Sequence, residues 1–264
     1  MLKKFLTVLF FFAVSMLNGG TLVIGDAGNF SAAGEILQHA ALEYALKSGQ
    51  EAAFQQIKPS EALSRLQAGV VDILLIERRF VPDDPALQKI PFAAEALVCY
   101  VCPENPLQNL SRKNVLDILT HPSPYWTDFL GLKIKIQRIT LKNSTAAGQL
   151  IYRIFGDKNF ASEIFKVSSN EQLFKFLNAA AIGFAPYQTE RPLGALAVKV
   201  DNILPDRKTV SSGKYPLTLR YDLVFLKKNA EKVSPLTKML FQEKYREKLE
   251  NSFLLPLLIP FCVE

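Results

Sequence analysis

The sequence predicts an α/β fold of two lobes, each a mainly parallel sheet flanked by helices, with a ligand cleft between the lobes. Two observations support this prediction. Short apolar runs with strand character alternate with segments of helical spacing, which is the pattern of parallel strands joined by crossover helices. The alternation occurs twice along the chain, and the final elements are placed to return to the first set. Ligands of such folds bind beyond the carboxyl ends of strands, where helices begin.

The first set of elements lies near the start of the chain. In order, the predicted elements are strand Leu22–Ile24, helix Ser31–Lys47, strand Ala53–Ile57, a helix from Ser60 to Gly69, and strand Val70–Ile76. Apolar residues at helical spacing predict the first helix. Ser60 is a typical N-cap residue and Gly69 a typical residue at a helix end, so they predict the limits of the second helix.

The second set follows a proline-rich turn through Pro82, Pro85 and Pro91. Its predicted elements are strand Ala96–Val101, helix Ser111–Leu119, strand Lys133–Ile139, helix Ser144–Phe155, helix Asn170–Leu177 and strand Ala181–Phe184. Two further strands, Ala197–Val200 and Tyr221–Leu226, and a Lys- and Glu-rich helix over Ser234–Leu249 end the chain. We expect these last elements to rejoin the first lobe.

The first 20 residues are typical of a secretion signal. Lys3 and Lys4 form a basic start, the apolar run Phe5–Leu17 has 13 residues, and small residues follow it. A membrane-spanning helix needs roughly 20 apolar residues, so this run is too short to span a bilayer. Cleavage at Ala13–Ser15 or near Gly20 fits, and no cysteine at the end of the run suggests a lipid anchor. We expect a periplasmic protein; the alternative is an uncleaved N-terminal anchor.

Composition excludes some partners. Without the first 20 residues the chain carries 29 basic and 25 acidic side chains, a net charge near +4. No block of five or more Lys or Arg residues occurs, so nucleic acid is not an expected partner. About 244 residues remain, enough for two lobes or for one large domain.

Cys99 and Cys102 have the C-x-x-C spacing of redox motifs, but the residues around them predict a strand. Residues three apart on a strand point to opposite faces, whereas a redox pair sits at a helix start that lowers the thiol pKa. We therefore interpret both as small buried apolar residues, with redox chemistry as the alternative. His39 and His121 do not cluster with cysteines or acidic residues, so no metal or other cofactor is expected.

Four segments of the chain form a recognisable series. Gly69–Ile73 reads G-x-x-D-I, Leu116–Leu119 precedes Trp126, Ala181–Phe184 reads A-I-G-F, and Lys199–Pro205 leads to Gly213–Leu217. In this order and spacing they resemble the phosphate-binding proteins of high-affinity phosphate ABC transporters, within the two-lobed solute-binding proteins. The resemblance implies a type II periplasmic binding protein fold, with two lobes joined by two crossing strands. We expect residues 21–98 in lobe 1, residues 99–203 in lobe 2, and residues 204–264 returning to lobe 1.

The resemblance implies a first ligand-binding loop at Gly28, Asn29, Phe30 and Ser31. Gly28 would let the backbone approach the ligand, and Asn29 and Ser31 would supply donors at the start of a helix. Free helix N–H groups and the helix dipole both favour an anion there. The alternative is an ordinary strand-to-helix turn in which Ser31 is only the N-cap.

A second contact is implied at Glu77, with Arg78 and Arg79 beside it. A carboxylate at this position accepts a hydrogen bond from a protonated oxyanion and rejects a fully deprotonated one. An Arg offers a planar, two-pronged donor to the same ligand. The alternative is a solvated charge cluster at a strand end.

The third implied contact, at Asn143, Ser144 and Thr145, departs from the family pattern R-x-x-S-G-T. Leu141 or Thr140 stands where the family has Arg, the family's Gly is absent, and Lys142 is the nearest cation. Lys binds as a point charge, with poorer geometry for an oxyanion than Arg. The departure puts phosphate itself in question, whereas the lobed fold is unaffected.

The function expected from these features is binding without catalysis. The resemblance implies a monomer that captures a small oxyanion, phosphate or a relative, and delivers it to an ABC permease by closure of its lobes. The alternative is a sensory or accessory protein of the same fold, with another ligand, that signals to a membrane receptor. An enzyme is not expected, because the sequence has neither a G-x-S-x-G nor an H-E-x-x-H motif.

Overall fold

The fold was analysed in a computed structural model that describes residues 20–28, 31–156 and 158–257. The strands are β1 (Leu22–Asp26), β2 (Ala52–Gln56), β3 (Ile73–Glu77), β4 (Leu87–Val101), β5 (Asn109–Leu110), β6 (Gln137–Leu141), β7 (Phe165–Val167), β8 (Ala181–Pro186), β9 (Leu196–Ala197), β10 (Lys199–Val200), β11 (Thr218–Leu226) and β12 (Leu255–Pro256). The helices are α1 (Ala32–Ser48), α2 (Pro59–Gln67), α3 (Arg112–Thr120), α4 (Thr127–Leu130), α5 (Ala146–Phe155), α6 (Asn170–Lys175), α7 (Arg207–Ser211), α8 (Ala230–Leu240) and α9 (Glu243–Asn251), with 3-10 turns at Arg78–Phe80 and Lys227–Asn229.

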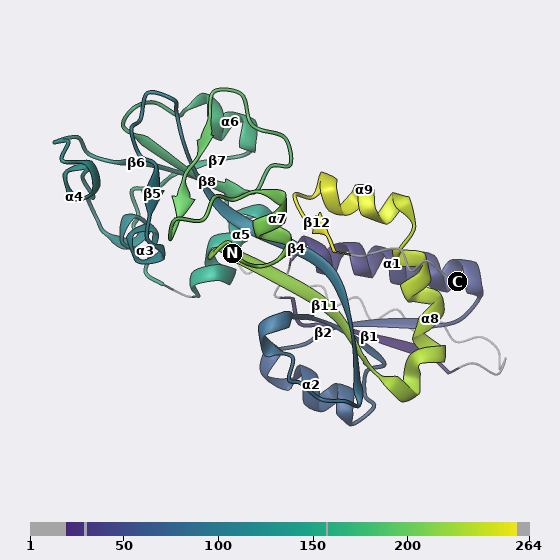
Figure 1. The fold of residues 1–264 in the computed structure, drawn as a ribbon. Coiled ribbons are helices and arrows are strands. Elements are labelled where there is room, and N and C mark those ends of the chain that lie inside the picture. The colour runs from purple at the N-terminus through teal and green to yellow at the C-terminus, as the bar shows by residue number, and fades with distance from the viewer. Residues whose placement is uncertain (1–19, 29–30, 157, 258–264) are drawn as a thin grey trace, which may run out of the picture.

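The main sheet has the strand order β2-β1-β3-β11-β4-β8-β6-β7. At one end β1 pairs in parallel with β2 and β3, and at the other end β6 pairs in parallel with β7 and β8. Figure 1 shows these two ends as separate lobes, with α1, α2, α8 and α9 around the first and α3, α4 and α6 around the second. The two-lobed α/β fold predicted from the sequence is therefore confirmed.

Strand β4 belongs to both lobes. Its first part, Leu87–Ala96, pairs antiparallel with β11, and its second part, Leu97–Tyr100, pairs antiparallel with β8. Figure 1 shows β4 and β11 running side by side from one lobe toward the other. These are the two crossing strands that the resemblance implied. The lobe boundaries at residues 98 and 203 stay predictions.

The sequence predicted only the end of β4. Pro91 was assigned to a turn, because proline cannot donate to a strand ladder. In the structure Pro91 lies within β4, at the place where the register with β11 shifts between Tyr221 and Asp222. A bulge of this kind is where an extended strand tolerates proline.

Two helix predictions need correction. Lys58, not Ser60, is the N-cap of α2, because Pro59 takes the first helical position, which needs no N–H donor. The predicted helix over residues 234–249 is two helices, α8 and α9, separated at Phe241 and Gln242. A straight helix would turn the charged residues after Leu240 toward the core, and the break restores a buried face. The strand predicted at residues 133–139 begins four residues later, at Gln137.

The cysteine interpretation is confirmed for Cys99 and Cys102. Both are free and buried, and Cys99 lies within β4. Burial raises the pKa of the Cys99 thiol, the opposite of what a reactive thiolate requires.

Within the described ranges, no helix has the length and apolar character needed to cross a bilayer. Across those same residues, no group of three or more His, Cys, Asp or Glu side chains is arranged to hold a metal ion.

Candidate functional site

The loop between β1 and α1 is built around a buried carboxyl group. Asp26 is the last residue of β1 and is fully buried, and its Oδ1 accepts a hydrogen bond of 2.7 Å from the Gly28 backbone N–H. Its Oδ2 accepts one of 2.7 Å from the Gln56 side chain. Burial raises the pKa of Asp26, although these two donors lower it. The loop thus places an acid directly beneath the start of α1.

Ser31 is the N-cap of α1, as the sequence predicted. It is fully buried, and its Oγ accepts a 3.2 Å hydrogen bond from the Gly34 N–H. The first two N–H groups of the helix have no acceptor within the helix. Gly28 packs tightly, since a Cβ there would lie 2.7 Å from the Ser31 Oγ. Asn29 and Phe30, the other two predicted contacts in this loop, lie outside the described residues.

Glu77 ends β3 and is 2% exposed. Its Oε2 lies 2.7 Å from an Arg79 nitrogen, in an ion pair without hydrogen-bond geometry. Burial is the main influence and raises the pKa of Glu77, the Arg79 charge opposes it, and the Glu95 charge adds to it. Glu77 is therefore a buried acid paired with Arg79, not the solvated charge that the alternative interpretation required.

Arg78 is already paired within the protein. Its guanidinium donates to both carboxylate oxygens of Asp222 on β11, at 2.6–3.0 Å. Asp222 is 1% exposed, so this two-pronged pair joins the end of β3 to the neighbouring crossing strand. A ligand would have to displace a buried carboxylate to use Arg78.

Lobe 2 contributes Arg153, which is buried against the crossing strands. Its guanidinium donates three hydrogen bonds of 2.8–3.1 Å to the Glu95 carboxylate on β4 and one of 3.1 Å to the Ala146 carbonyl. The Tyr221 hydroxyl, from β11, donates to the same carboxylate at 2.5 Å. Burial raises the pKa of Tyr221 well above its ordinary value, and the Glu95 charge adds to this. One carboxylate thus joins α5 to both crossing strands.

The loop before α5 supplies the third predicted contact. Thr145 is the N-cap of α5, and its Oγ1 accepts a 3.0 Å hydrogen bond from the Gly148 N–H. Ser144 is exposed, whereas the Asn143 amide donates to the Tyr152 hydroxyl at 2.7 Å. Leu141, near the position of the family's Arg, is 5% exposed and belongs to the apolar core.

The predicted residues are only partly brought together. Strand register places Glu77 opposite Tyr221, and Tyr221 touches the Glu95–Arg153 pair that leads to α5. In the same sheet β1 and β3 are parallel neighbours, so their last residues, Asp26 and Glu77, lie at the same end of the sheet. Arg78 is turned to β11 and does not join this group.

Sequence reasoning missed three members of this group, Glu95, Arg153 and Tyr221. Glu95 is a lone acid in the apolar run of β4, and Arg153 a lone base in the apolar α5. Charged residues are almost never fully buried unless they are paired. Two single charges of opposite sign in two apolar elements were the signal for a buried ion pair.

Comparisons with known proteins identify the class of fold. Neither a protein-family model nor a curated protein sequence matches the chain. Solved structures do match, and among them are a phosphate transport receptor and a possible phosphate binding protein. The chain thus shares the two-lobed α/β fold of these structures.

Three of these structures cover most of the chain. An ABC-type phosphate transport receptor from Vibrio cholerae aligns with a TM-score of 0.63 at 19% identity, over 89% of this chain and 99% of its own. PstS from Borrelia burgdorferi aligns with a TM-score of 0.66 at 17% identity, over 90% of this chain and 98% of its own. A possible phosphate binding protein from Planctomyces limnophilus aligns with a TM-score of 0.72 at 18% identity, over 90% of this chain and 93% of its own. At these identities the chain shares their fold, and the resemblance inferred from the sequence is confirmed at that level.

Proposed function

We propose that this chain is an exported solute-binding protein, which holds a small oxyanion between its lobes and presents it to a membrane permease. One observation carries the proposal: each lobe has a strand-to-helix loop with a hydroxyl N-cap, Ser31 before α1 and Thr145 before α5. The fold shared with three phosphate-receptor structures supports the same function. No catalytic step is part of the proposal.

The physical basis is the free N–H groups at the two helix starts. These groups and the helix dipoles favour an anion without any cationic side chain. Glu77 would select the protonation state, since a buried carboxylate accepts a hydrogen bond from a protonated oxyanion and repels a fully deprotonated one. Closure of the lobes around the ligand would give the form that the permease receives.

A second candidate function keeps the fold but changes the ligand and the partner. Arg78 and Arg153 are both held by internal carboxylates, Asp222 and Glu95, and Leu141 is buried where an Arg was expected. Neither arginine therefore has a free guanidinium group with which to bind an oxyanion. This favours a ligand other than phosphate, and the protein would then report its bound state to a receptor.

Isothermal titration calorimetry with phosphate, sulfate, molybdate and small carboxylates tests the proposal. We expect one of the inorganic oxyanions to bind with no turnover, and the affinity to fall in Ser31→Ala and Thr145→Val. Lys133→Met is the control, because Lys133 is exposed and belongs to neither loop. Heat from a carboxylate alone would support the second candidate. Absence of heat from every ligand would rule out the oxyanion proposal.

Location and closure need separate measurements. Fractionation should find the full-length gene product in the periplasm, and a chain lacking residues 2–20 in the cytoplasm. Small-angle scattering should show a smaller radius of gyration with the bound anion than without it.

A further inference from the structure

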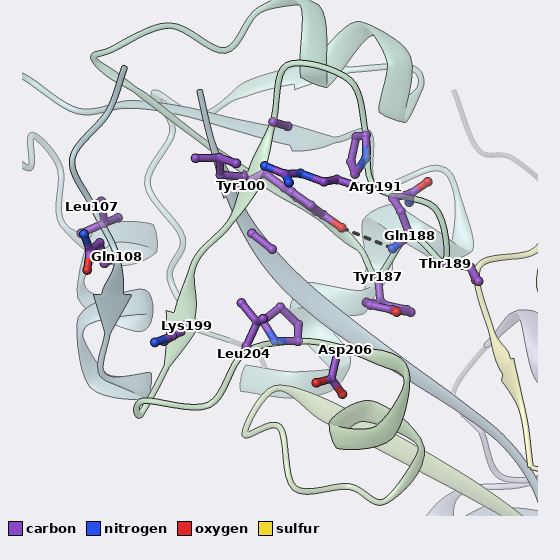
Figure 2. A pocket seen from close by; sticks show the side chains of 15 residues that line it. Tyr100, Leu107, Gln108, Tyr187, Gln188, Thr189, Arg191, Lys199, Leu204 and Asp206 are labelled. Carbon is purple, nitrogen blue, oxygen red and sulfur yellow. Dashed lines mark hydrogen bonds between the residues drawn. The ribbon is translucent and has the colours of Figure 1, made fainter. Parts of the chain in front are cut away.

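A cavity of about 500 Å³ lies beside the crossing strand β4, at residues that the proposed function does not use (Figure 2). It is bounded by β4, by β9, by the loop that follows β8, and by the segment leading to α7. The residues that line it include Tyr100, Gln188, Arg191, Leu196, Lys199 and Leu204. Ligand pockets usually measure about 300–1,000 Å³, so this cavity is large enough for a small organic molecule.

This cavity and the Glu95 cluster lie on opposite faces of the sheet. Tyr100 and Glu95 are five residues apart on β4, and alternation along a strand turns them to opposite sides. Their contacts agree with this. The Tyr100 ring packs edge-on against Phe174 of α6, at 5.1 Å between centroids, whereas Glu95 is bound by Arg153 of α5. A ligand in this cavity would therefore not compete directly with one between the lobes.

The wall of the cavity is fixed by hydrogen bonds. The Tyr100 hydroxyl accepts a 3.2 Å bond from the Gln188 N–H, drawn as the dashed line in Figure 2, and donates one of 3.4 Å to the Pro186 carbonyl. The Gln188 side chain donates to the same carbonyl at 3.0 Å. The start of the loop after β8 is thus tied to the crossing strand, and the aromatic ring is held in the cavity wall.

Two cationic side chains line the cavity from different segments, Arg191 from the loop after β8 and Lys199 from β10 (Figure 2). Both are exposed, and within residues 20–28, 31–156 and 158–257 neither side chain has an ion-pair or hydrogen-bond partner. The one acid in the lining, Asp206, is the N-cap of α7, where its Oδ1 accepts a 2.7 Å bond from Thr209. The cavity therefore combines free positive charge with apolar surface from Tyr100 and the adjoining leucine and proline side chains.

We propose that this cavity binds a small organic carboxylate with a flat apolar body. The carboxylate would pair with Arg191, and the apolar part would lie against Tyr100 and Leu204, with Lys199 adding positive charge elsewhere in the lining. An inorganic oxyanion fits this site less well, because it would leave the apolar walls without a partner. Because its lining is both charged and apolar, this cavity should select a different class of ligand from the inorganic oxyanion proposed between the lobes.

The test uses benzoate and 3-phenylpropionate on the full mature chain, with their uncharged amides as matched probes. In heteronuclear NMR the carboxylates should shift the amide signals of residues 187–191 saturably, and the neutral amides should bind at least roughly 10-fold more weakly. Inorganic phosphate should leave these signals in place. Failure of both carboxylates to give saturable shifts there, or equal affinity for the neutral amides, would overturn the proposal.

Variants locate the site. Arg191→Met should weaken binding by roughly 10-fold, the value of a charge-assisted contact, and Lys199→Met should weaken it less. Ala197→Phe should abolish it by filling the cavity, and Lys133→Met should leave it unchanged. Thermal melts followed by circular dichroism check that each variant is folded. If Ala197→Phe does not fold, the variants of the two exposed cations still test the site. Unchanged binding in Arg191→Met would also overturn the proposal.

Discussion

Replacing Arg153 with Met should destabilise the protein strongly. The side chains of Arg153 and Glu95 are only 3% and 6% exposed, so removal of the cation leaves a carboxylate buried without its counter-charge. Breaking one side of such a pair costs about 3–5 kcal/mol of the free energy of unfolding. The Tyr221 hydroxyl still donates to the carboxylate, so we expect the lower part of that range. Urea denaturation followed by circular dichroism measures the change.

A double-mutant cycle separates the pair from other losses. Glu95→Gln combined with Arg153→Met removes both charges of the pair, so the double variant should be more stable than Arg153→Met alone, with a coupling of at least about 1 kcal/mol. Arg207→Met is the matched control, since its pair with Glu250 is half exposed and should be worth less than about 1 kcal/mol. The reasoning is refuted if Arg153→Met costs no more than Arg207→Met, or if the cycle shows no coupling.

Three further predictions concern lobe 1. Burial raises the pKa of Glu77 above its ordinary 4.5, so the native state binds this proton more tightly, and the stability it gives is lost as pH rises through the folded pKa. In urea denaturation at pH values from about 4 to about 8, the stability of Glu77→Gln relative to the wild type should therefore increase as the pH rises. A stability difference that does not change with pH would contradict this. Hydrogen bonds, first from Lys244, lower the pKa of Glu43 from 4.5 to about 2, so its contribution is present above pH 4.5 and lost as pH falls through about 2. Glu43→Gln should accordingly lower the melting temperature at neutral pH and not near pH 2. A Cβ on Gly34 would overlap the Asp26 carboxylate, so Gly34→Ala should cost about 1–3 kcal/mol in urea denaturation despite the better helix former; a stabilised variant would disprove the clash.

Local patterns were enough to predict the elements and their grouping. Ser31, Ser111 and Thr145 lie at helix starts because their side chains cap the backbone, and capping depends only on neighbouring residues. Alternation of strands and helices determines the parallel connections in each lobe. For these reasons the two-lobed fold was predictable from one sequence.

Long-range pairing was not predictable in the same way. Arg78 and Asp222 are 144 residues apart, and only the placement of β11 beside β3 brings them together. A charge beside a strand end gives no indication of its partner, so Arg78 was assigned to a ligand. The Arg153–Glu95 pair depends likewise on α5 packing against β4.

The position of β11 has a consequence for how the chain is made. This strand lies between β3 and β4, so two strands that are consecutive along the chain never pair with each other. During synthesis from the N-terminus, β3 and β4 must wait with unpaired edges until residues 218–226 have emerged. Unpaired edges invite association between chains, and pairing of distant segments folds slowly. A holding chaperone should therefore matter more for this protein's yield than for one whose strands pair in order.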